Sequence, residues 1–315
     1  MNFSSLDYFV ALVQEKNYTR AAERLHITQQ TLSAHIAQLE RELGSPLVIR
    51  HVPLEFTWAG QVFYRHALRM RQDADTMRKA MADAAEERTG ILRLGIAPNR
   101  DQAIFPAIFS RYTKRFPGVR IELTEDINRS LIDRLAEGSL DLIMAHYEEV
   151  RLGIVSEAFY TASMVLLIPV VLLKELCEKE NMEYASVVKL MKSGKRGCFS
   201  PLRECPFLLS GAGTVPGRLA RSLLAEADIE PFIRIASDNL RLQVALCLQG
   251  IGAMFCTENI VERDIPPERR EEIVEIPLAH RDSQISFCYH EGLENWKPLT
   301  AFIEEAREVM HGIEE

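Results

Sequence analysis

Length, composition and charge restrict the class of protein. The chain has 315 residues, of which 47% are hydrophobic and 26% charged, and this is the composition of a folded globular protein, not of a disordered or fibrous one. Its formal net charge of −8, taken alone, argues against a nucleic-acid binder. No apolar run approaches the roughly 20 residues that a membrane span needs, and the N-terminus lacks the features of a secretory signal. The six cysteines indicate reduced cytosolic thiols before a disulfide framework.

The charge is unevenly distributed along the chain. Residues 1–90 hold 11 Lys or Arg and 11 Asp or Glu, whereas residues 91–315 hold 26 and 34. Up to Gln72 the count is 8 basic to 6 acidic residues, so the N-terminal part is slightly positive. This asymmetry suggests two units with different partners.

The first 60 residues are predicted to form short helices separated by turns. Ser4 begins a candidate capping box for the first helix, and Thr19 is a candidate N-cap for a short second helix. Thr28 is predicted to cap a longer third helix that ends at Gly44. The apolar stripe of this third helix consists of Leu32, Ile36, Leu39 and Leu43. Residues 47–57 are predicted as a small hairpin or wing, so the segment has the helix-turn-helix arrangement.

A heptad pattern follows the wing. Apolar residues step by four and three through three heptads, which is the spacing of a two-stranded coiled coil. The seam consists of Phe63, Ala67, Met70, Ala74, Met77, Met81 and Ala84. The alternative is a single helix that packs on its own domain, but the pattern favours dimerisation.

From residue 91 onward, predicted strands and helices alternate, which indicates an α/β fold with a mostly parallel sheet. The predicted strands are 91–97, 119–123, 141–145, 206–209, 232–236, 251–256, 273–276 and 284–289. The predicted helices include 102–116, 130–137, 216–227, 240–248 and 297–311. An apolar run at residues 162–171 is followed by helical segments.

The third helix presents a face that suits the major groove of DNA. Opposite its apolar stripe it carries short or amide side chains, which hydrogen-bond to base edges without steric bulk. Arginines and a histidine nearby are candidates for phosphate contacts. The candidate DNA-binding residues are Thr19, Arg20, Thr28, Gln29, Gln30, Thr31, Ser33, His35, Gln38, Arg50 and His51. The alternative is an ordinary solvated helix face.

These N-terminal residues resemble the winged helix-turn-helix of the LysR-type transcriptional regulators. The matching positions are Ala21–Ser33, Ile36–Gly44, Leu47, Arg50, Thr57, Ala59 and Gly60. The resemblance continues more loosely over the rest of the chain. It implies a winged helix-turn-helix domain at 1–58, a dimerisation linker helix at 59–89 and a two-lobed α/β effector-binding domain of periplasmic-binding-protein type at 91–315, with lobe I at 91–161 and 268–315 and lobe II at 162–267.

The resemblance also implies the partners of the protein. Members of this family are cytoplasmic dimers or tetramers that bind promoter DNA at inverted repeats and respond to a small effector. RNA polymerase is a further possible partner. Neither a metal nor a cofactor is expected, and no enzymatic activity is expected.

The chain departs from the family pattern at several positions. Gln30 stands where the family usually has Pro, and Ala34 stands where a basic residue is frequent. Val48 and Ile49 replace an aromatic and an acidic residue, and Trp58 precedes the Ala-Gly pair. The expected fold does not depend on these positions, but no base contact is expected from position 34.

The effector is expected in the cleft where strand ends of the two lobes face each other. The candidate effector-binding residues are Pro98, Asn99, Arg100, Asn128, Ser130, His146, Ser210, Gly213, Thr214, Ser237 and Asn239. A carboxylate is one candidate effector, since Arg100 or Arg129 is available to pair with it. The chain is expected to cross between the lobes near Thr161 and again near Pro267.

Three alternatives remain at this point. Cys198 and Cys205, six residues apart and near basic residues, suggest a redox-responsive regulator, although a buried and inert thiol is the favoured interpretation. A solute-binding protein has no use for residues 1–88. An enzyme on the same scaffold lacks a catalytic motif, and the glycines at 211, 213 and 217 have the wrong spacing for dinucleotide binding.

Overall fold

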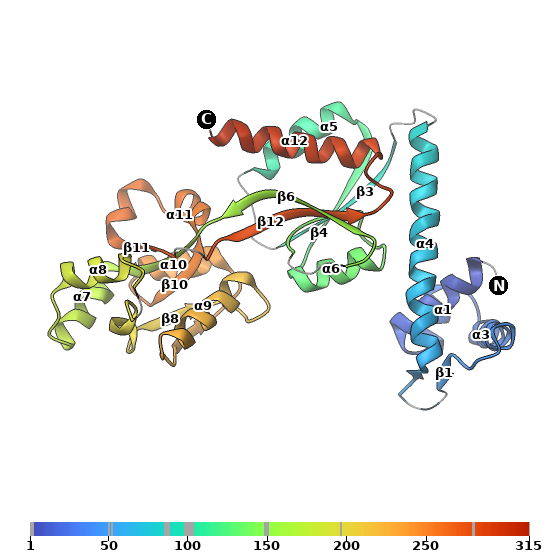
Figure 1. Cartoon of the computed structure of the whole chain (residues 1–315), viewed down its shortest axis with the longest axis horizontal. Helices are drawn as coiled ribbons and strands as arrows, with labels where there is room; N and C mark the ends of the chain where they lie inside the picture. The colour runs from blue at the N-terminus through green and yellow to red at the C-terminus, as the bar shows by residue number, and fades with distance from the viewer. Residues whose placement is uncertain are drawn as a thin grey trace.

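The computed structural model describes residues 3–49, 51, 53–84, 89–97, 104–147, 151–195, 197–278 and 281–314. Figure 1 shows three parts in chain order: a small helical unit, one long helix and an α/β part divided into two lobes. This confirms the predicted fold class. None of the helices in these ranges is long and apolar enough to cross a membrane.

The N-terminal unit consists of three helices and a two-stranded wing: α1 (Phe3–Glu15), α2 (Tyr18–Arg24), α3 (Gln29–Leu43), β1 (Val48–Ile49) and β2 (Glu55–Phe56). Thr28 caps α3 as predicted, because its side chain accepts the Thr31 N–H at 3.1 Å. Gly44 ends α3 in the left-handed conformation at φ 67°.

Three local predictions in this unit are wrong. Thr19 does not cap α2; the side chain of Asn17, which has extended backbone, accepts the N–H groups of Thr19 and Arg20 instead. Ser4 cannot be an N-cap, because α1 already includes Phe3. Leu43 is exposed at the end of α3, whereas the rest of its stripe is buried.

The wing is attached to α3 and to the next helix by close contacts. The carboxylate of Glu40 on α3 accepts the N–H groups of Leu47 and Val48, at 2.8 and 3.1 Å. A Cβ atom on Gly60 would lie 2.2 Å from the carbonyl oxygen of Leu47. Only glycine therefore fits where the wing passes the following helix.

The long helix α4 (Trp58–Ala84) packs partly on its own domain. Ala67 is fully buried in a cluster with Leu6 and Val10 of α1, and Phe63 is half-buried, with its ring 5.2 Å from that of Phe9. These two seam positions are thus covered within the protomer, which is the alternative considered for this helix. Ala74 is also buried.

The methionines of the predicted seam are exposed, in contrast to its two buried alanines. Met70, Met77 and Met81 are 42%, 60% and 67% exposed. The side chain of Ala84 lies outside the described part of the chain. The exposed methionines therefore narrow the candidate dimer seam to the C-terminal two-thirds of α4.

Lobe I is a five-stranded sheet in the order β4-β3-β5-β12-β6. Its elements are β3 (Thr89–Ile96), α5 (Phe105–Arg115), β4 (Gly118–Glu125), α6 (Asn128–Ala136), β5 (Leu142–His146), β6 (Ile154–Ala162), β12 (Ser283–His290) and α12 (Lys297–Glu314). The helices α5 and α12 share one core with the sheet, and α6 packs on a second one. Parallel pairing of β3 with β4 and β5 confirms the predicted parallel centre.

Lobe II is a second five-stranded sheet, in the order β11-β7-β10-β8-β9. Its strands are β7 (Met164–Pro169), β8 (Pro206–Leu209), β9 (Phe232–Ala236), β10 (Ala253–Thr257) and β11 (Ile273–Pro277). Its helices are α7 (Val170–Lys179), α8 (Tyr184–Lys192), α9 (Val215–Glu226), α10 (Leu240–Leu248) and α11 (Glu258–Asp264), with 3-10 turns η1 (Ser200–Leu202) and η2 (Pro267–Glu272). The helices α7, α8 and α9 share one core, and α10 and α11 share another.

The chain crosses between the lobes twice. The first crossing lies at Ser163, between β6 and β7. The second crossing was expected near Pro267, and this boundary is wrong. Strand β11 pairs antiparallel with β7 along residues 273–277 and so belongs to lobe II. The return to lobe I therefore lies between Pro277 and Ser283.

Two elements escaped the sequence analysis. Strand β6 lies at the edge of its sheet, and its residues are half-buried or exposed, so its sequence shows no clear alternation of apolar and polar residues. The short helix α11 directly follows β10. In addition, the apolar run at 162–171 divides between the fully buried strand β7 and the first turn of α7, a boundary that hydrophobicity alone does not mark.

Candidate functional site

The N-terminal half of α3 presents an exposed polar surface. Gln29, Gln30 and Thr31 are exposed, and Ser33 is half-buried. Gln38 is exposed as well, with its amide donating to a glutamate one turn further on at 3.1 Å. Side chains of this kind on an accessible helix suit contacts with base edges in a groove.

Other predicted DNA-binding residues have structural contacts of their own. The hydroxyl of Thr28 lies 2.8 Å from that of Thr31, so both belong to the N-terminal cap of α3. The ring of His35 packs edge-on against Tyr8 of α1, with 4.9 Å between ring centroids. Thr19 is exposed at the start of α2. His35 thus also contributes to the contact between α1 and α3.

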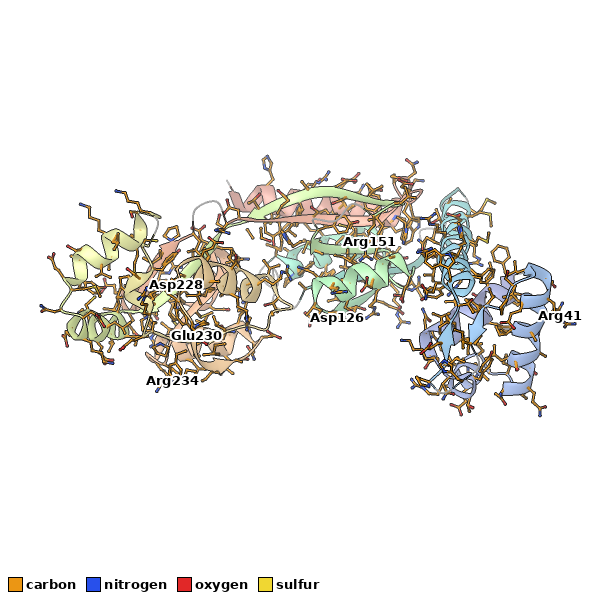
Figure 2. All side chains as sticks on the ribbon, turned by 60° about the horizontal axis from the view of Figure 1, so that its bottom comes forward. Arg41, Asp126, Arg151, Asp228, Glu230 and Arg234 are labelled. Carbon is orange, nitrogen blue, oxygen red and sulfur yellow. The ribbon has the colours of Figure 1, made fainter. Side chains whose placement is uncertain are left out.

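The basic candidates that the structure describes lie on α2 and in the wing. Arg20 and Arg24 both pair with Glu15 of α1, at 2.9 and 3.3 Å, and remain largely exposed. His51 is exposed in the wing, 3.5 Å from a glutamate there. Arg50 lies outside the described residues. Figure 2 shows a further arginine, Arg41, on α3 at the outer edge of the molecule.

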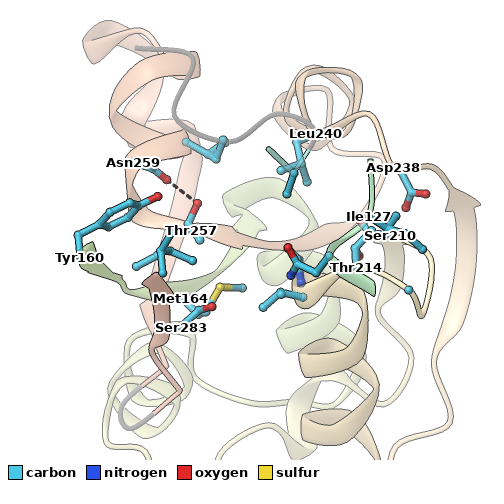
Figure 3. A pocket seen from close by; sticks show the side chains of 18 residues that line it. Ile127, Tyr160, Met164, Ser210, Thr214, Asp238, Leu240, Thr257, Asn259 and Ser283 are labelled. Carbon is cyan, nitrogen blue, oxygen red and sulfur yellow. Dashed lines mark hydrogen bonds between the residues drawn. The ribbon is translucent and has the colours of Figure 1, made fainter. Parts of the chain in front are cut away.

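The second candidate site is a cleft between the two lobes, with an empty volume of about 870 Å³ that includes its open mouth (Figure 3). The described lining residues from lobe I are Ala97, Ile127, Asn128, Tyr160, Ala162, Ser283 and Ile285. Those from lobe II are Met164, Ser210, Gly213, Thr214, Val215, Pro216, Asp238, Leu240, Thr257, Asn259 and Ile260. Apolar walls with a few hydroxyl and amide groups are typical of a small-molecule site.

Three helices of at least nine residues, α6, α9 and α10, begin at this cleft, as does the seven-residue α11. The first turns of α6, α9 and α10 contribute Asn128, Val215 and Leu240 to the lining. The cap of α9 is Thr214, whose hydroxyl accepts the Gly217 N–H at 3.1 Å. The N-terminal end of each helix carries partial positive charge and unpaired N–H groups. The cleft is therefore favourable for an anionic group.

A buried glutamine orients one hydroxyl of the lining. Gln243 on α10 is fully buried, and its amide nitrogen donates to the Ser210 hydroxyl at 3.0 Å and to the Ser237 carbonyl oxygen. Because these bonds use both N–H groups of the amide, the Ser210 oxygen accepts and its own proton remains available as a donor.

The structure brings some predicted effector residues together. Asn128, Ser210, Gly213 and Thr214 line the cleft. The remaining candidates fall into two groups. Pro98, Asn99 and Arg100 lie outside the described residues. Ser130, His146, Ser237 and Asn239 are described but do not line the cleft.

The four candidates that do not line the cleft have local structural partners. Ser130 donates to an aspartate before α6 at 2.5 Å. Asn239 caps α10, and its backbone N–H donates to the Ser237 hydroxyl at 3.2 Å. The Nδ1 atom of His146 lies 3.0 Å from the hydroxyl of Ser283, so His146 contacts a lining residue without lining the cleft itself.

Several lining residues were missed by the sequence analysis. Tyr160, Met164 and Ser283 flank the crossings between the lobes. Thr257 pairs with Met164 across β10 and β7, and Asn259 lies in the first turn of α11 beside Thr257 (Figure 3). A segment that crosses between two lobes must pass the base of the cleft. The predicted crossing near residue 161 was therefore a usable signal for Tyr160 and Met164.

Asp238 is the only charged side chain among the described lining residues. Its carboxylate accepts the Gly211 N–H at 2.7 Å and lies at the start of α10. Both features offset its negative charge.

The six cysteines are free and buried. Burial raises the pKa of the Cys205 thiol to about 12 and also raises that of Cys198. A redox sensor requires an accessible thiol of low pKa. The structure thus gives no support to the redox alternative at Cys198 and Cys205. Among the described residues, no group of His, Cys, Asp or Glu is placed to hold a metal ion.

A winged helix-turn-helix joined by a linker helix to a two-lobed cleft domain defines a DNA-binding regulator with an effector-binding domain. Residues 3–61 match the family described as the bacterial regulatory helix-turn-helix protein, lysR family, and residues 85–311 match the LysR substrate binding domain. The chain therefore belongs to the LysR-type transcriptional regulators, which are DNA-binding proteins and not enzymes.

Individual relatives agree with this assignment. The chain is 27% identical over 278 residues to the uncharacterized HTH-type transcriptional regulator YcgK of Bacillus subtilis (strain 168), a match that covers 85% of this chain and 83% of YcgK. It is 32% identical over 171 residues to the transcriptional regulator AlsR of the same organism, covering 54% of this chain and 56% of AlsR.

A solved structure has the same fold. Full-length OxyR of Pseudomonas aeruginosa superposes with a TM-score of 0.66 at 20% identity, covering 98% of this chain and 95% of that chain.

Proposed function

We propose that this protein is a cytoplasmic, effector-responsive regulator that binds an inverted repeat in promoter DNA as a dimer or tetramer. The observation that carries the proposal is the combination, in one chain, of the exposed polar N-terminal half of α3 with a cleft between two lobes. A two-fold symmetric dimer presents two copies of α3 to two half-sites, which is why an inverted repeat is expected. RNA polymerase is a further proposed partner, as a promoter-bound regulator lies beside it.

The exposed methionines on α4 support the proposed dimer. Met70, Met77 and Met81 lie on one side of the helix at heptad spacing. Each is a large apolar side chain, and burying it against a second copy is favourable by about 1.5–3 kcal/mol. A second α4 is the proposed occupant of this stripe.

For DNA recognition we propose that Gln29, Gln30, Thr31, Ser33 and Gln38 face the bases, with His35 at the edge of that face. Thr19, Thr28, Arg20, Arg50 and His51 are proposed to contact phosphates. A base contact gives sequence discrimination, whereas a phosphate contact gives affinity for any sequence and a steeper salt dependence.

Fluorescence anisotropy tests this division with two DNAs: the operator, which is the inverted repeat that the chain selects from random double-stranded DNA, and an unrelated sequence. Gln30→Ala is expected to cost about 1–3 kcal/mol on the operator only. Arg20→Ala is expected to weaken binding to both DNAs. Glu262→Ala, in α11 of lobe II, is the matched surface control. Equal losses on both DNAs for Gln30→Ala contradict the assignment.

For the effector we propose a small molecule with an apolar body and one carboxylate. Support comes from the apolar walls, from the free proton of Ser210 and from the three helix N-termini at the cleft. Asp238 does not oppose this choice, because the Gly211 N–H and the α10 terminus already offset its charge.

A thermal-shift screen with matched acid and amide pairs, such as benzoate and benzamide, tests the effector class. The acid is expected to stabilise the protein and the amide is not. Ser210→Ala is expected to reduce the shift by removing the donor, whereas Ser222→Ala, on the exposed face of α9, keeps it. Stabilisation by amides alone contradicts the carboxylate.

A further inference from the structure

The DNA-binding unit and the linker helix rest directly on lobe I of the same chain. The carboxylate of Glu137, which follows the last residue of α6, lies 3.5 Å from the hydroxyl of Tyr64 on α4. It also accepts a hydrogen bond from the amide of Gln14 on α1, at 3.4 Å. One carboxylate at the end of α6 thus connects lobe I to two helices of the N-terminal part.

A buried ion pair forms the second half of this contact. Lys79 of α4 pairs with Asp141, which is only 1% exposed, and lies 4.8 Å from the ring centroid of Trp296. Asp141 also accepts the backbone N–H of Arg93 at 2.8 Å, so it stays hydrogen-bonded when Lys79 leaves. Asp141 of lobe I is thus held in place by a backbone hydrogen bond, whereas Lys79 of α4 leaves the ion pair when α4 moves away from lobe I.

The contact between these surfaces is imperfectly satisfied. Gln14 Oε1, Gln72 Nε2 and Thr76 Oγ1 are buried and have no hydrogen-bond partner. Gln72 packs against Gly138, and Thr76 packs against Gly292. An unpaired buried polar atom costs about 1–3 kcal/mol, and a buried ion pair gives little net stability. These unpaired atoms offset part of the free energy that the docked arrangement gains from its ion pair and hydrogen bonds.

Helix α6 links this contact to the effector cleft. Ile127 and Asn128 at its start line the cleft, and Glu137 follows its end. The helix has 9 residues, so its ends lie about 14 Å apart. Leu131, Ile132 and Leu135 are buried in one cluster with residues of β5 and β12, so α6 is tightly packed on the sheet of lobe I.

We propose that the contact of Lys79 and Glu137 with their partners is a latch that holds the linker helix on lobe I, and that α6 transmits effector binding from the cleft to this latch. The second half rests on the proposed effector function of the cleft, whereas the latch itself does not. An effector that shifts α6 favours either the docked or the undocked state, and this changes the freedom of α4 and the attached DNA-binding helices.

The test uses a thiol reagent on the full chain without DNA or effector. T76C places a thiol inside the contact, and the six native cysteines are buried, so their background reaction is slow. Thr76 is half-buried and its Oγ1 atom is inaccessible, so a thiol at that place is labelled slowly while the latch is closed and faster once it opens. Lys79→Met keeps the length of the side chain and removes its charge, and it is expected to accelerate labelling about tenfold.

Arg78→Met is the matched control, because Arg78 is 69% exposed on the same helix and its loss leaves the contact intact. T76C with Arg78→Met is expected to be labelled at the same rate as T76C alone. Equal rates for Lys79→Met and Arg78→Met overturn the latch, as does fast labelling of T76C alone. T76C alone, T76C with Lys79→Met and T76C with Arg78→Met are all expected to bind DNA. Loss of DNA binding in any of them would indicate that the variant unfolds, not that its linker helix undocks.

A second pair of variants tests the transmission through α6. Ile127→Trp enlarges a side chain in the cleft, and Arg129→Trp puts the same ring on an exposed position of α6. In the T76C background, Ile127→Trp is expected to change the labelling rate at least about threefold and Arg129→Trp is not. Equal rates overturn the transmission. Because no effector is added, this failure is distinguishable from failure of the proposed effector function.

Discussion

At the scale of single residues, backbone contacts explain the residues that carried the resemblance. Gly60 is needed because the Leu47 carbonyl occupies the space of a Cβ atom. Glu40 holds two backbone N–H groups of the wing. The sequence predicted these positions as a motif, but their physical roles involve atoms that only the folded chain brings together.

Gly60→Ala is expected to destabilise the N-terminal unit by at least about 1–3 kcal/mol, because the new methyl group overlaps the Leu47 carbonyl. Thermal unfolding followed by circular dichroism measures this loss. Gly312→Ala is the control: it lies in α12 with nothing near its Cβ position, and alanine is the better helix former. An unchanged unfolding temperature for Gly60→Ala contradicts the proposed contact.

The buried thiols give the protein a predictable loss of stability at high pH. Burial raises the pKa of Cys205 to about 12, against about 8.5 for an unfolded thiol. This contribution to the free energy of unfolding is complete below pH 8.5 and is lost as the pH rises from there toward 12, by about 1.4 kcal/mol per unit.

The contribution of the Cys205 thiol to the free energy of unfolding is measured by urea unfolding of the native chain and of Cys205→Ala at pH 8 and pH 10. The native chain is expected to lose more stability over that range than the variant, since other titrating groups are common to both. An equal loss for the two proteins contradicts a buried neutral thiol at this position.

At the scale of elements, patterns predicted what depends on local periodicity and failed where pairing is non-local. The predicted range of α10 is the observed one, because its boundaries are marked by Asn239 and by the end of the apolar run. Strand β11 was predicted as a strand but assigned to the wrong lobe. Its partner β7 lies about a hundred residues away in sequence, and no property of residues 273–277 identifies that partner.

The residues that line the cleft were predicted only in part, because some of them also meet through non-local strand pairing. Positions that follow a strand and start a helix, such as Asn128 and Thr214, were expected at the cleft and do line it. Tyr160 and Ser283 come from neighbouring antiparallel strands, and their meeting depends on the register of β6 with β12. Register across more than a hundred residues is not encoded in a local pattern.

The methionine stripe of α4 yields a prediction for assembly. Met77→Glu with Met81→Glu is expected to raise the dimer dissociation constant at least about tenfold, because each charged side chain would be buried twice in a symmetric interface. Sedimentation of the purified protein measures this change. Arg78→Glu, beside the stripe, is the control. A dimer of unchanged strength contradicts the proposed seam.

At the scale of the whole molecule, the net charge of −8 no longer argues against DNA binding. The negative excess lies in residues 91–315, while residues 1–90 are neutral overall. We therefore expect the DNA-binding unit to depend on local contacts and on the avidity of the proposed dimer. Weak binding to non-specific DNA is expected, in contrast to a strongly basic protein.

Selection of sequences from random double-stranded DNA with the full chain tests the proposal that this regulator reads an inverted repeat through paired α3 helices. We expect enrichment of two inverted half-sites at least one helical turn apart. We also expect the binding to weaken steeply as the salt concentration rises. Enrichment of a single half-site, or of no sequence at all, would contradict the proposal.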